Sequence, residues 1–469
     1  MKTILFDSRA GFLDRQSLMH QYIERLPDKE IRPVSVFHDH VSYNKYKYLK
    51  DTELLSNYWN PGHKAYTKSD ISKIEEKYGQ INFWNIIASD RFIRRWPEVK
   101  IIEQISFYIY AWEKIIEKYK PLFIISETVT GLWNYILILI CKSNGIKYLS
   151  VQTTKNTGRY YYSDDQYGRW KELEDKFIEI KQRGLTINEK LLAQQFVKNF
   201  REHPLVPPYM KQSSALPNFK KYINLPRFII NLKKDLIQNW YYSNHDYKLG
   251  YRIFDYVYTL IRVKRILASK FFKIFEFPDF EKDYVLFPVH FQPEATTDIW
   301  APFYSDQLYT IKAIARSLPF GFYLYVKEHI SVLGSKKIFF YKEIKKIPNV
   351  KLINPWSNIS DLIKNSKAVA VITSTTGLES IFWNKPTIVF GNVFYNIYPF
   401  VHRINNINDF PEYLGKILSE KIEEDNPDRL AFVYIYSMLG YESDIYDYQL
   451  TEERISGFVR DLLEEIEKQ

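Results

Sequence analysis

The first 170 residues alternate between short apolar runs and longer amphipathic stretches. The apolar runs predict buried strands at residues 2–6, 32–37, 121–126 and 147–152. Apolar residues near helical spacing predict helices at 99–119 and 130–143, the second closed by Asn144 and Gly145. Strand, helix and strand in this order form a β-α-β unit, which predicts a parallel sheet with helices on both faces.

A second alternating region begins at Asp283. The predicted strands are 284–289, 322–326, 350–353, 369–372 and 387–390, and the predicted helices include 306–317, 359–364, a start at 377–383, and 452–468 in the tail. Two α/β halves with a helical tail are typical of nucleotide-handling proteins, whose ligand lies at the carboxyl ends of the strands.

A basic helical segment separates the two halves at about 175–275. Between residues 211 and 273 it holds nine Lys and four Arg against three Asp, a net +10 that equals the charge of the whole chain. Lys and Arg alternate there with Phe, Tyr and Ile, as in helices that meet anionic lipid. The charge would also suit nucleic acid or a phosphorylated ligand, and a solvated connector with a buried aromatic face is the alternative.

Composition excludes several classes of protein. Hydrophobic residues make up 46% of the 469, so the chain can fill cores of two domains. The single Cys141 excludes an internal disulfide framework and a cysteine-based zinc site. We find no signal peptide and no apolar run of spanning length, and expect a cytoplasmic protein.

Motifs of other enzyme classes are absent from the sequence: there is no P-loop, dinucleotide fingerprint, zincin helix or nucleophile elbow. Asp164–Asp165 and His38–His40 are read as solvated loop residues, so no metal site is expected.

Polar clusters follow four predicted strands of the second half, at 290–294, 327–329, 373–380 and 385–391. Lys327 and His329 can meet a phosphate. The hydroxyl-rich run ending in Gly377 predicts an anion site at a helix N-terminus, where Glu379 either closes a capping box or accepts from a ribose diol. A capped strand end and a surface turn are the structural alternatives for the first two clusters.

These motifs resemble those of the bacterial capsule and surface polysaccharide biosynthesis proteins. The resemblance covers about 283–402 and is carried by 290–294, 306–307, 326–329, 347–350, 373–379 and 385–391. That family includes Kdo transferases of capsule export lipids and is similar in outline to bacterial sialyltransferases.

The resemblance implies a GT-B glycosyltransferase, with two Rossmann-like domains and a cleft between them, a helical insertion and a helical tail. The expected segments are 1–175 (acceptor domain), 176–275 (basic connector), 276–410 (nucleotide-sugar domain) and 411–469 (terminal helices). It further implies a metal-independent reaction without a cofactor and a CMP-sugar donor, because His329 and the hydroxyls of 374–376 match phosphate-contacting motifs of CMP-sugar enzymes.

Roles follow from this resemblance and from positions at strand ends. His329 stabilises the departing phosphate, and Glu127, after the strand at 121–126, is the expected general base. The expected donor-binding residues are His290, Gln292, Glu294, Lys327, Ser374, Thr375, Thr376, Gly377, Glu379 and Gly391. The expected acceptor-binding residues are Gln152, Lys155 and Arg159.

The expected partners are a nucleotide-sugar donor, a glycan or lipid-linked acceptor and, through 211–273, the anionic inner face of the cytoplasmic membrane, with no nucleic acid. Two alternatives remain. One is an enzyme of the UDP-sugar 2-epimerase type, and the other is a non-catalytic protein that binds anions or nucleic acid.

Overall fold

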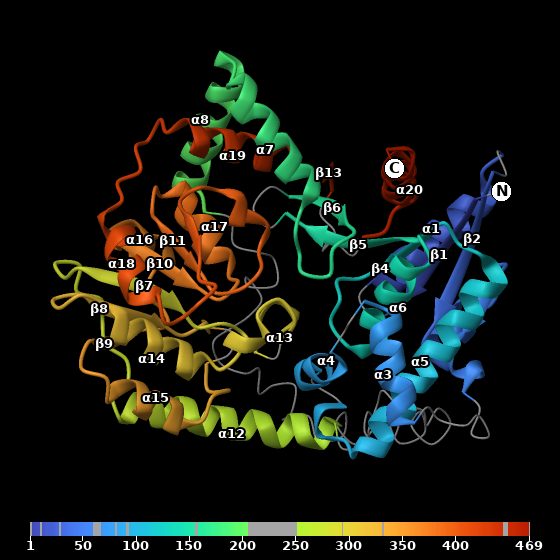
Figure 1. The fold of residues 1–469 in the computed structure, drawn as a ribbon, viewed down its shortest axis with the longest axis horizontal. Coiled ribbons are helices and arrows are strands. Elements are labelled where there is room, and N and C mark those ends of the chain that lie inside the picture. The colour runs from blue at the N-terminus through green and yellow to red at the C-terminus, as the bar shows by residue number, and fades with distance from the viewer. Residues whose placement is uncertain are drawn as a thin grey trace. The chain divides into compact units, whose positions relative to one another are not determined.

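The computed structural model describes residues 2–9, 12–27, 30–59, 67–79, 82–90, 93–154, 158–204, 251–292, 294–330, 333–443 and 449–468. The chain forms two compact units, Met1–Arg169 with Leu439–Gln469, and Trp170–Met438. Each unit contains its own β-sheet (Figure 1).

The first unit is built on a sheet with strand order β13-β6-β5-β4-β1-β2-β3. Its strands are β1 (Lys2–Ser8), β2 (Ile31–Phe37), β3 (Thr52–Leu54), β4 (Phe123–Ser126), β5 (Lys147–Thr153), β6 (Arg159–Ser163) and β13 (Tyr441–Glu442). The first five are parallel, and β6 and β13 add antiparallel pairs at one side. The chain runs outward from β1 to β3 and then crosses to β4, so the order of the strands reverses between β1 and β4.

Helices cover both faces of this sheet. They are α1 (Leu13–Arg25), α2 (His40–Tyr46), α3 (Lys68–Lys77), α4 (Phe83–Ser89), α5 (Glu98–Tyr119), α6 (Leu132–Ser143) and α20 (Glu452–Glu467). The apolar stripe of α5 is buried, including Trp112, and α6 is buried from Leu132 to Cys141. Burial of this much apolar area is the main stabilising contribution to the unit.

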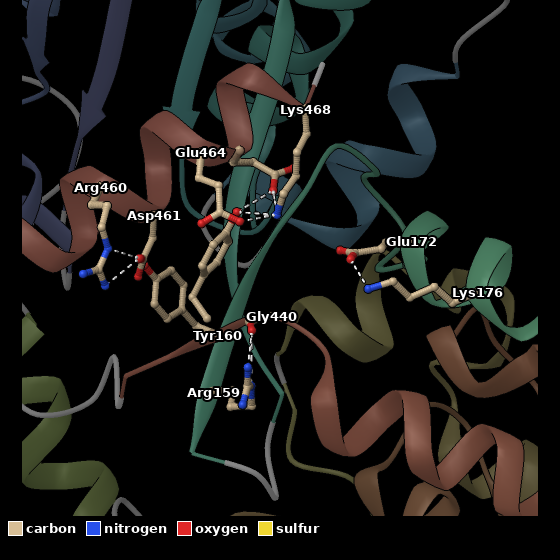
Figure 2. A network of polar contacts seen from close by, with 11 residues as sticks. Arg159, Tyr160, Glu172, Lys176, Gly440, Arg460, Asp461, Glu464 and Lys468 are labelled. Carbon is tan, nitrogen blue, oxygen red and sulfur yellow. Dashed lines mark hydrogen bonds and ion pairs between the residues drawn. The ribbon is translucent and has the colours of Figure 1, made fainter. Parts of the chain in front are cut away.

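The end of the chain returns to the first unit. Helix α20 packs on α1, and its Asp461 accepts a hydrogen bond from the hydroxyl of Tyr160 at 2.9 Å, as Figure 2 shows. The Arg159 guanidinium donates to the carbonyl of Gly440 at 2.7 Å and forms an ion pair with Glu442. These contacts complete the sheet beside β6 with a segment about 280 residues away in sequence.

The second unit has a fully parallel sheet with strand order β12-β11-β10-β7-β8-β9. Its strands are β7 (Tyr284–Pro288), β8 (Tyr323–Lys327), β9 (Val350–Ile353), β10 (Ala368–Val371), β11 (Thr387–Val389) and β12 (Val401–Arg403). All of β7 and β10 is buried, as expected for strands covered on both faces. The strand order reverses between β7 and β10, and ligands of such sheets bind at that point.

The helices of the second unit are α7 (Lys171–Arg183), α8 (Ile187–Glu202), α12 (Tyr251–Phe271), α13 (Ala295–Asp298), α14 (Gln307–Ser317), α15 (Ile338–Lys345), α16 (Ile359–Asn365), α17 (Thr375–Phe382), α18 (Phe410–Ser419) and α19 (Pro427–Met438). Helices α7 and α8 pack on α19, and α12 lies along α15 (Figure 1).

The predicted α/β class with two parallel-sheet halves is confirmed. The expected boundaries at 175 and 410 differ from the observed division, because the terminal helix contacts the first sheet and α7, α8 and α19 belong with the second. Residues 205–250, nearly half of the predicted basic connector at 176–275, lie outside the described residues.

Candidate functional site

The carboxyl end of the second sheet brings the ends of β7 and β10 together. His290 follows β7, and its Nε2 atom accepts a hydrogen bond from the backbone amide of Ile372, just after β10, at 3.0 Å. A ring nitrogen that accepts a hydrogen bond carries no proton, so the ring is neutral. Burial lowers the pKa of His290 to about 3, with smaller contributions from the charges of Lys336 and His329. His290 therefore fixes the backbone at the point where the strand order reverses.

Gln307 holds the segment that follows His290. Its side-chain oxygen accepts from the amide of His290 at 2.7 Å, and its side-chain nitrogen donates to the Gln292 oxygen at 2.5 Å. Gln292 in turn donates to the carbonyl of Ser305. Glu294 is exposed and accepts from Thr296, in the first turn of α13. Of these predicted donor residues, His290 and Gln292 are thus held by the protein itself.

An open pocket of about 360 Å³ lies beside this segment. It is lined by Gln292, Ser305, Asp306, Gln307, Leu308, Lys336, Lys337, Phe339 and Phe340. The pocket therefore offers amide groups, two ammonium groups and two aromatic rings to a ligand, a combination suited to an anionic molecule with a planar part.

A basic cluster of Lys327, His329 and Lys336 surrounds one buried carboxyl, Glu328. The Lys327 ammonium donates to the carbonyl of Pro355 at 2.9 Å. Burial lowers the pKa of Lys327 to about 8 and also lowers that of Lys336, although Glu328 opposes both shifts. Burial, with help from the charge of Lys327, lowers the pKa of His329 to about 4.

The carboxyl of Glu328 already has hydrogen-bond donors within the protein. It accepts from the hydroxyl of Tyr341 at 2.6 Å and from the amide of His329 at 2.9 Å, and burial raises its pKa. The charges of Lys327 and Lys336 therefore act on one carboxyl that is already hydrogen-bonded. A bound phosphate would supply the negative charge that these partly desolvated groups lack.

The hydroxyl-rich run forms the predicted helix N-terminus. Ser374 is the N-cap of α17, and its hydroxyl oxygen accepts from the amide of Thr376 at 3.2 Å. The amide of Gly377 donates to the carbonyl of Ser374. The backbone amides of 376 and 377, at the predicted anion site, thus take part in the cap. Thr375, half-buried at the first helical position, remains the most available of the predicted hydroxyl residues.

Glu379 lies one turn further along α17. It is partly exposed, and the structure records no hydrogen bond for its carboxylate among the described residues. Burial raises the pKa of Glu379 to about 7. A carboxyl in this state can accept hydrogen bonds from ligand hydroxyls, because no protein donor occupies it.

The two predicted glycines are needed by the protein's own packing. A side chain at Gly377 would meet the Tyr395 hydroxyl, and one at Gly391 would meet Thr373 and Ala301. The Tyr395 hydroxyl also donates to the carbonyl of Ser374 at 2.5 Å. Gly391 therefore allows close packing of β11 against the run after β10 and is not itself left open toward a ligand.

The predicted residues of the first unit are differently placed. Glu127 follows β4 and is partly exposed, and its carbonyl accepts from the Tyr148 hydroxyl. Gln152 bonds the Tyr161 hydroxyl and Ser150, and Arg159 pairs with the returning segment at Gly440. Lys155 lies outside the described residues. Gln152 and Arg159 thus have structural partners in place of an open acceptor surface.

Several site residues were not identified from the sequence. Lys336 belongs to no strand end, and only the fold brings it beside Glu328. His38 was read as a solvated loop residue, which is wrong: its side chain is 4% exposed and pairs with Asp7. The available signal was Asp7, a carboxylate that directly follows the apolar run 4–6 within β1.

The described residues hold neither a candidate metal cluster nor a candidate membrane-spanning helix. No cluster of three or more His, Cys, Asp or Glu side chains that could hold a metal ion occurs in them. None of their helices combines the length and the apolar character needed to cross a bilayer.

Comparisons with solved structures found proteins that share little sequence with this chain. Among solved structures, the chain is similar to the β-Kdo 2,7 transferase of KpsC from Thermosulfurimonas dismutans (13% identity, 78% of this chain and 97% of that one, TM-score 0.36). It is also similar to the β-Kdo 2,4 transferase of the same KpsC (12% identity, 68% of this chain and 79% of that one, TM-score 0.36). A third similar structure is UDP-GlcNAc 2-epimerase from Neisseria meningitidis bound to UDP-GlcNAc (12% identity, 100% of this chain and 100% of that one, TM-score 0.29).

No curated protein matches the chain. Residues 275–402, which hold nearly all of the second sheet and its polar clusters, match the model of the family described as capsule polysaccharide biosynthesis protein. The resemblance predicted from the sequence is therefore confirmed over 275–402: this part of the chain is similar to the capsule polysaccharide biosynthesis proteins.

Proposed function

We propose that the protein is a glycosyltransferase of capsule or surface polysaccharide synthesis that uses a nucleotide-sugar donor, with a CMP-sugar favoured. The observation that carries the proposal is the basic cluster of Lys327, His329 and Lys336 beside the carboxyl ends of β7 and β10. It lies within the segment that matches the family model.

The chemistry of transfer fits this arrangement. When the bond from the anomeric carbon to the phosphate breaks, negative charge grows on the phosphate oxygens, and fixed positive groups nearby stabilise it. Lys327 and Lys336 supply that charge, and His329 gains affinity for a proton as the phosphate becomes more negative. Glu379 accepts from the ribose hydroxyls in this assignment. The donor is therefore assigned to the second unit.

Calorimetric titration with CMP, UDP, GDP and CDP tests the donor assignment. We expect one nucleotide to bind best, CMP first among them, and we expect His329→Ala and Lys327→Met to weaken it at least about tenfold. The exposed Lys364→Met, on α16, serves as a control with a small effect. Unchanged affinity in both cluster variants contradicts the site. A new sugar formed from the donor alone, without an acceptor, favours the epimerase alternative.

A peripheral contact with anionic lipid forms part of this proposal. On α12, Leu260, Lys264 and Leu267 recur at i, i+4 and i+7, which places them on one helix face, and all three are exposed. Two arginines of α12 instead bind the protein: Arg262 donates to the carbonyl of Leu333, and Arg265 to that of Ser335. Lysines and apolar side chains on the outer face suit the surface of an anionic membrane.

A further inference from the structure

Three neighbouring strands of the first sheet end in polar side chains that contact one another. In the strand order β2-β1-β4, His38 follows β2, Asp7 lies near the end of β1, and Ser126 is the last residue of β4. This is the carboxyl end of the sheet, where the strand order reverses between β1 and β4 (Figure 1). Open α/β sheets place their ligands at this point.

The Asp7 carboxylate is held on both sides. Its Oδ1 atom lies 2.6 Å from Nε2 of His38, and its Oδ2 atom accepts a hydrogen bond from the Ser126 hydroxyl at 2.6 Å. The Asp7 side chain is fully buried, and that of His38 is 4% exposed. Because a buried carboxylate needs donors, Nε2 of His38 carries a hydrogen directed at Asp7.

This hydrogen bond fixes the tautomer of the imidazole. With the hydrogen on Nε2, the lone pair of the neutral ring is on Nδ1. Nδ1 has no hydrogen-bond partner among the described residues and is not among their fully buried, unpartnered polar atoms. The Trp112 ring, 6.1 Å away between centroids, borders the imidazole. Nδ1 is therefore the one atom of this group that can accept a proton from outside.

We propose that His38 is the general base for the acceptor hydroxyl, oriented by Asp7 and Ser126; this assignment rests on the proposed transferase function. The acceptor oxygen forms a bond to the anomeric carbon, and the bond between that carbon and the phosphate oxygen breaks, its electron pair leaving with the phosphate. The hydroxyl proton passes to Nδ1 of His38, and Asp7 stabilises the imidazolium until the proton is released to water. His38 takes the role that the sequence analysis gave to Glu127.

Nucleotide release from a panel of CMP-, UDP- and GDP-sugars, with capsule oligosaccharide as acceptor, tests the base. We expect His38→Gln and His38→Ala to lower kcat at least about 100-fold, the usual range for loss of a general base, without changing calorimetric affinity for the nucleotide. Free imidazole should restore part of the activity of His38→Ala. A purely structural histidine would show no such rescue.

The positioning role of Asp7 has its own measurement. In Asp7→Asn the new amide donates to Nε2, which moves the ring hydrogen to Nδ1 and removes the base. We expect kcat to fall as in His38→Gln with KM unchanged. Nitrogen NMR of labelled histidine should show His38 with its hydrogen on Nε2 in the wild type and on Nδ1 in Asp7→Asn.

His20 provides a matched control in the same unit. It is fully buried and bonded to Ser35 and Glu24, but it lies on helix α1 and does not itself follow a strand. We expect His20→Gln to lose stability and to keep kcat per folded molecule. Full kcat in His38→Gln overturns the assignment to His38, and loss of transfer in Glu127→Gln beside it returns the role of the base to Glu127. A wild type that binds no nucleotide or releases none from any donor overturns the transferase function itself.

Discussion

The imidazole of His290 accepts the backbone amide of Ile372 at 3.0 Å and thereby joins the ends of β7 and β10. This bond exists only while the ring is neutral, and burial holds the pKa of His290 at about 3. A residue that the sequence analysis assigned to donor binding thus shapes the site through the backbone.

Acid should weaken the His290–Ile372 hydrogen bond and lower the stability of the fold. A histidine whose pKa is lowered on folding contributes stability that is present above its unfolded value of 6.5 and lost as the pH falls toward 3. In His290→Gln the side-chain oxygen can still accept from Ile372 but does not titrate. We expect this variant to be less stable by about 1 kcal/mol at pH 7 and to lose less stability between pH 6.5 and 4 in urea unfolding. Parallel pH profiles of the two proteins would refute this role.

Nucleotide affinity should fall above pH 8. Lys327 has a pKa lowered by burial to about 8, so its positive charge disappears as the pH rises through that value. We expect the affinity for CMP, measured by calorimetry, to weaken up to about tenfold between pH 7 and 9.5, which corresponds to about 1.4 kcal/mol. Lys327→Arg, whose guanidinium stays charged, should show a flat profile. A flat profile in the wild type would exclude Lys327 from the anion site.

Glu379 should destabilise the folded chain at alkaline pH. Its pKa rises from 4.5 to about 7 on burial, so its contribution to stability is complete below pH 4.5 and is lost as the pH rises through 7. We expect Glu379→Gln to be more stable than the wild type at pH 8, by up to about 3 kcal/mol, and equal at pH 4.5. Urea unfolding at both values measures this, with the exposed Glu294→Gln as control. A variant less stable than the wild type at pH 8 contradicts it.

The stability of the packing of α20 on the first unit should depend on the hydroxyl of Tyr160. Tyr160 is fully buried, and its hydroxyl donates to Asp461 on α20 (Figure 2). Removing the donor leaves a buried carboxylate short of one partner, so Tyr160→Phe should cost about 1–3 kcal/mol. Hydrogen exchange should accelerate in α20 and β13. Tyr441→Phe, whose hydroxyl bonds the partly buried Glu465, should have a smaller effect.

Binding to anionic vesicles should depend on the outer lysines of α12. We expect flotation with phosphatidylserine vesicles at low salt and loss of flotation at high salt, because exposed charges are screened. Lys264→Glu with Lys270→Glu should abolish it, and Lys176→Glu with Lys181→Glu on α7 should not. Absence of flotation at low salt removes the membrane contact from the proposal.

The sequence by itself determined the two α/β halves and the strand ends of the second one. Apolar runs such as 284–288 and 368–371 leave no polar face, so only buried parallel strands suit them. The hydroxyl run was placed correctly at the start of α17, because Ser374 is a favoured N-cap residue.

Only the tertiary structure decided which polar groups are free. His290, Gln292 and Arg159 looked available in the sequence but are held by Ile372, Gln307 and Gly440, because long-range hydrogen bonds leave no local pattern. The Asp7–His38 pair and the return of α20 to β6 likewise join residues far apart in the chain. Periodicity reports which face of an element is buried, whereas the partner of a buried polar atom is set by packing between elements.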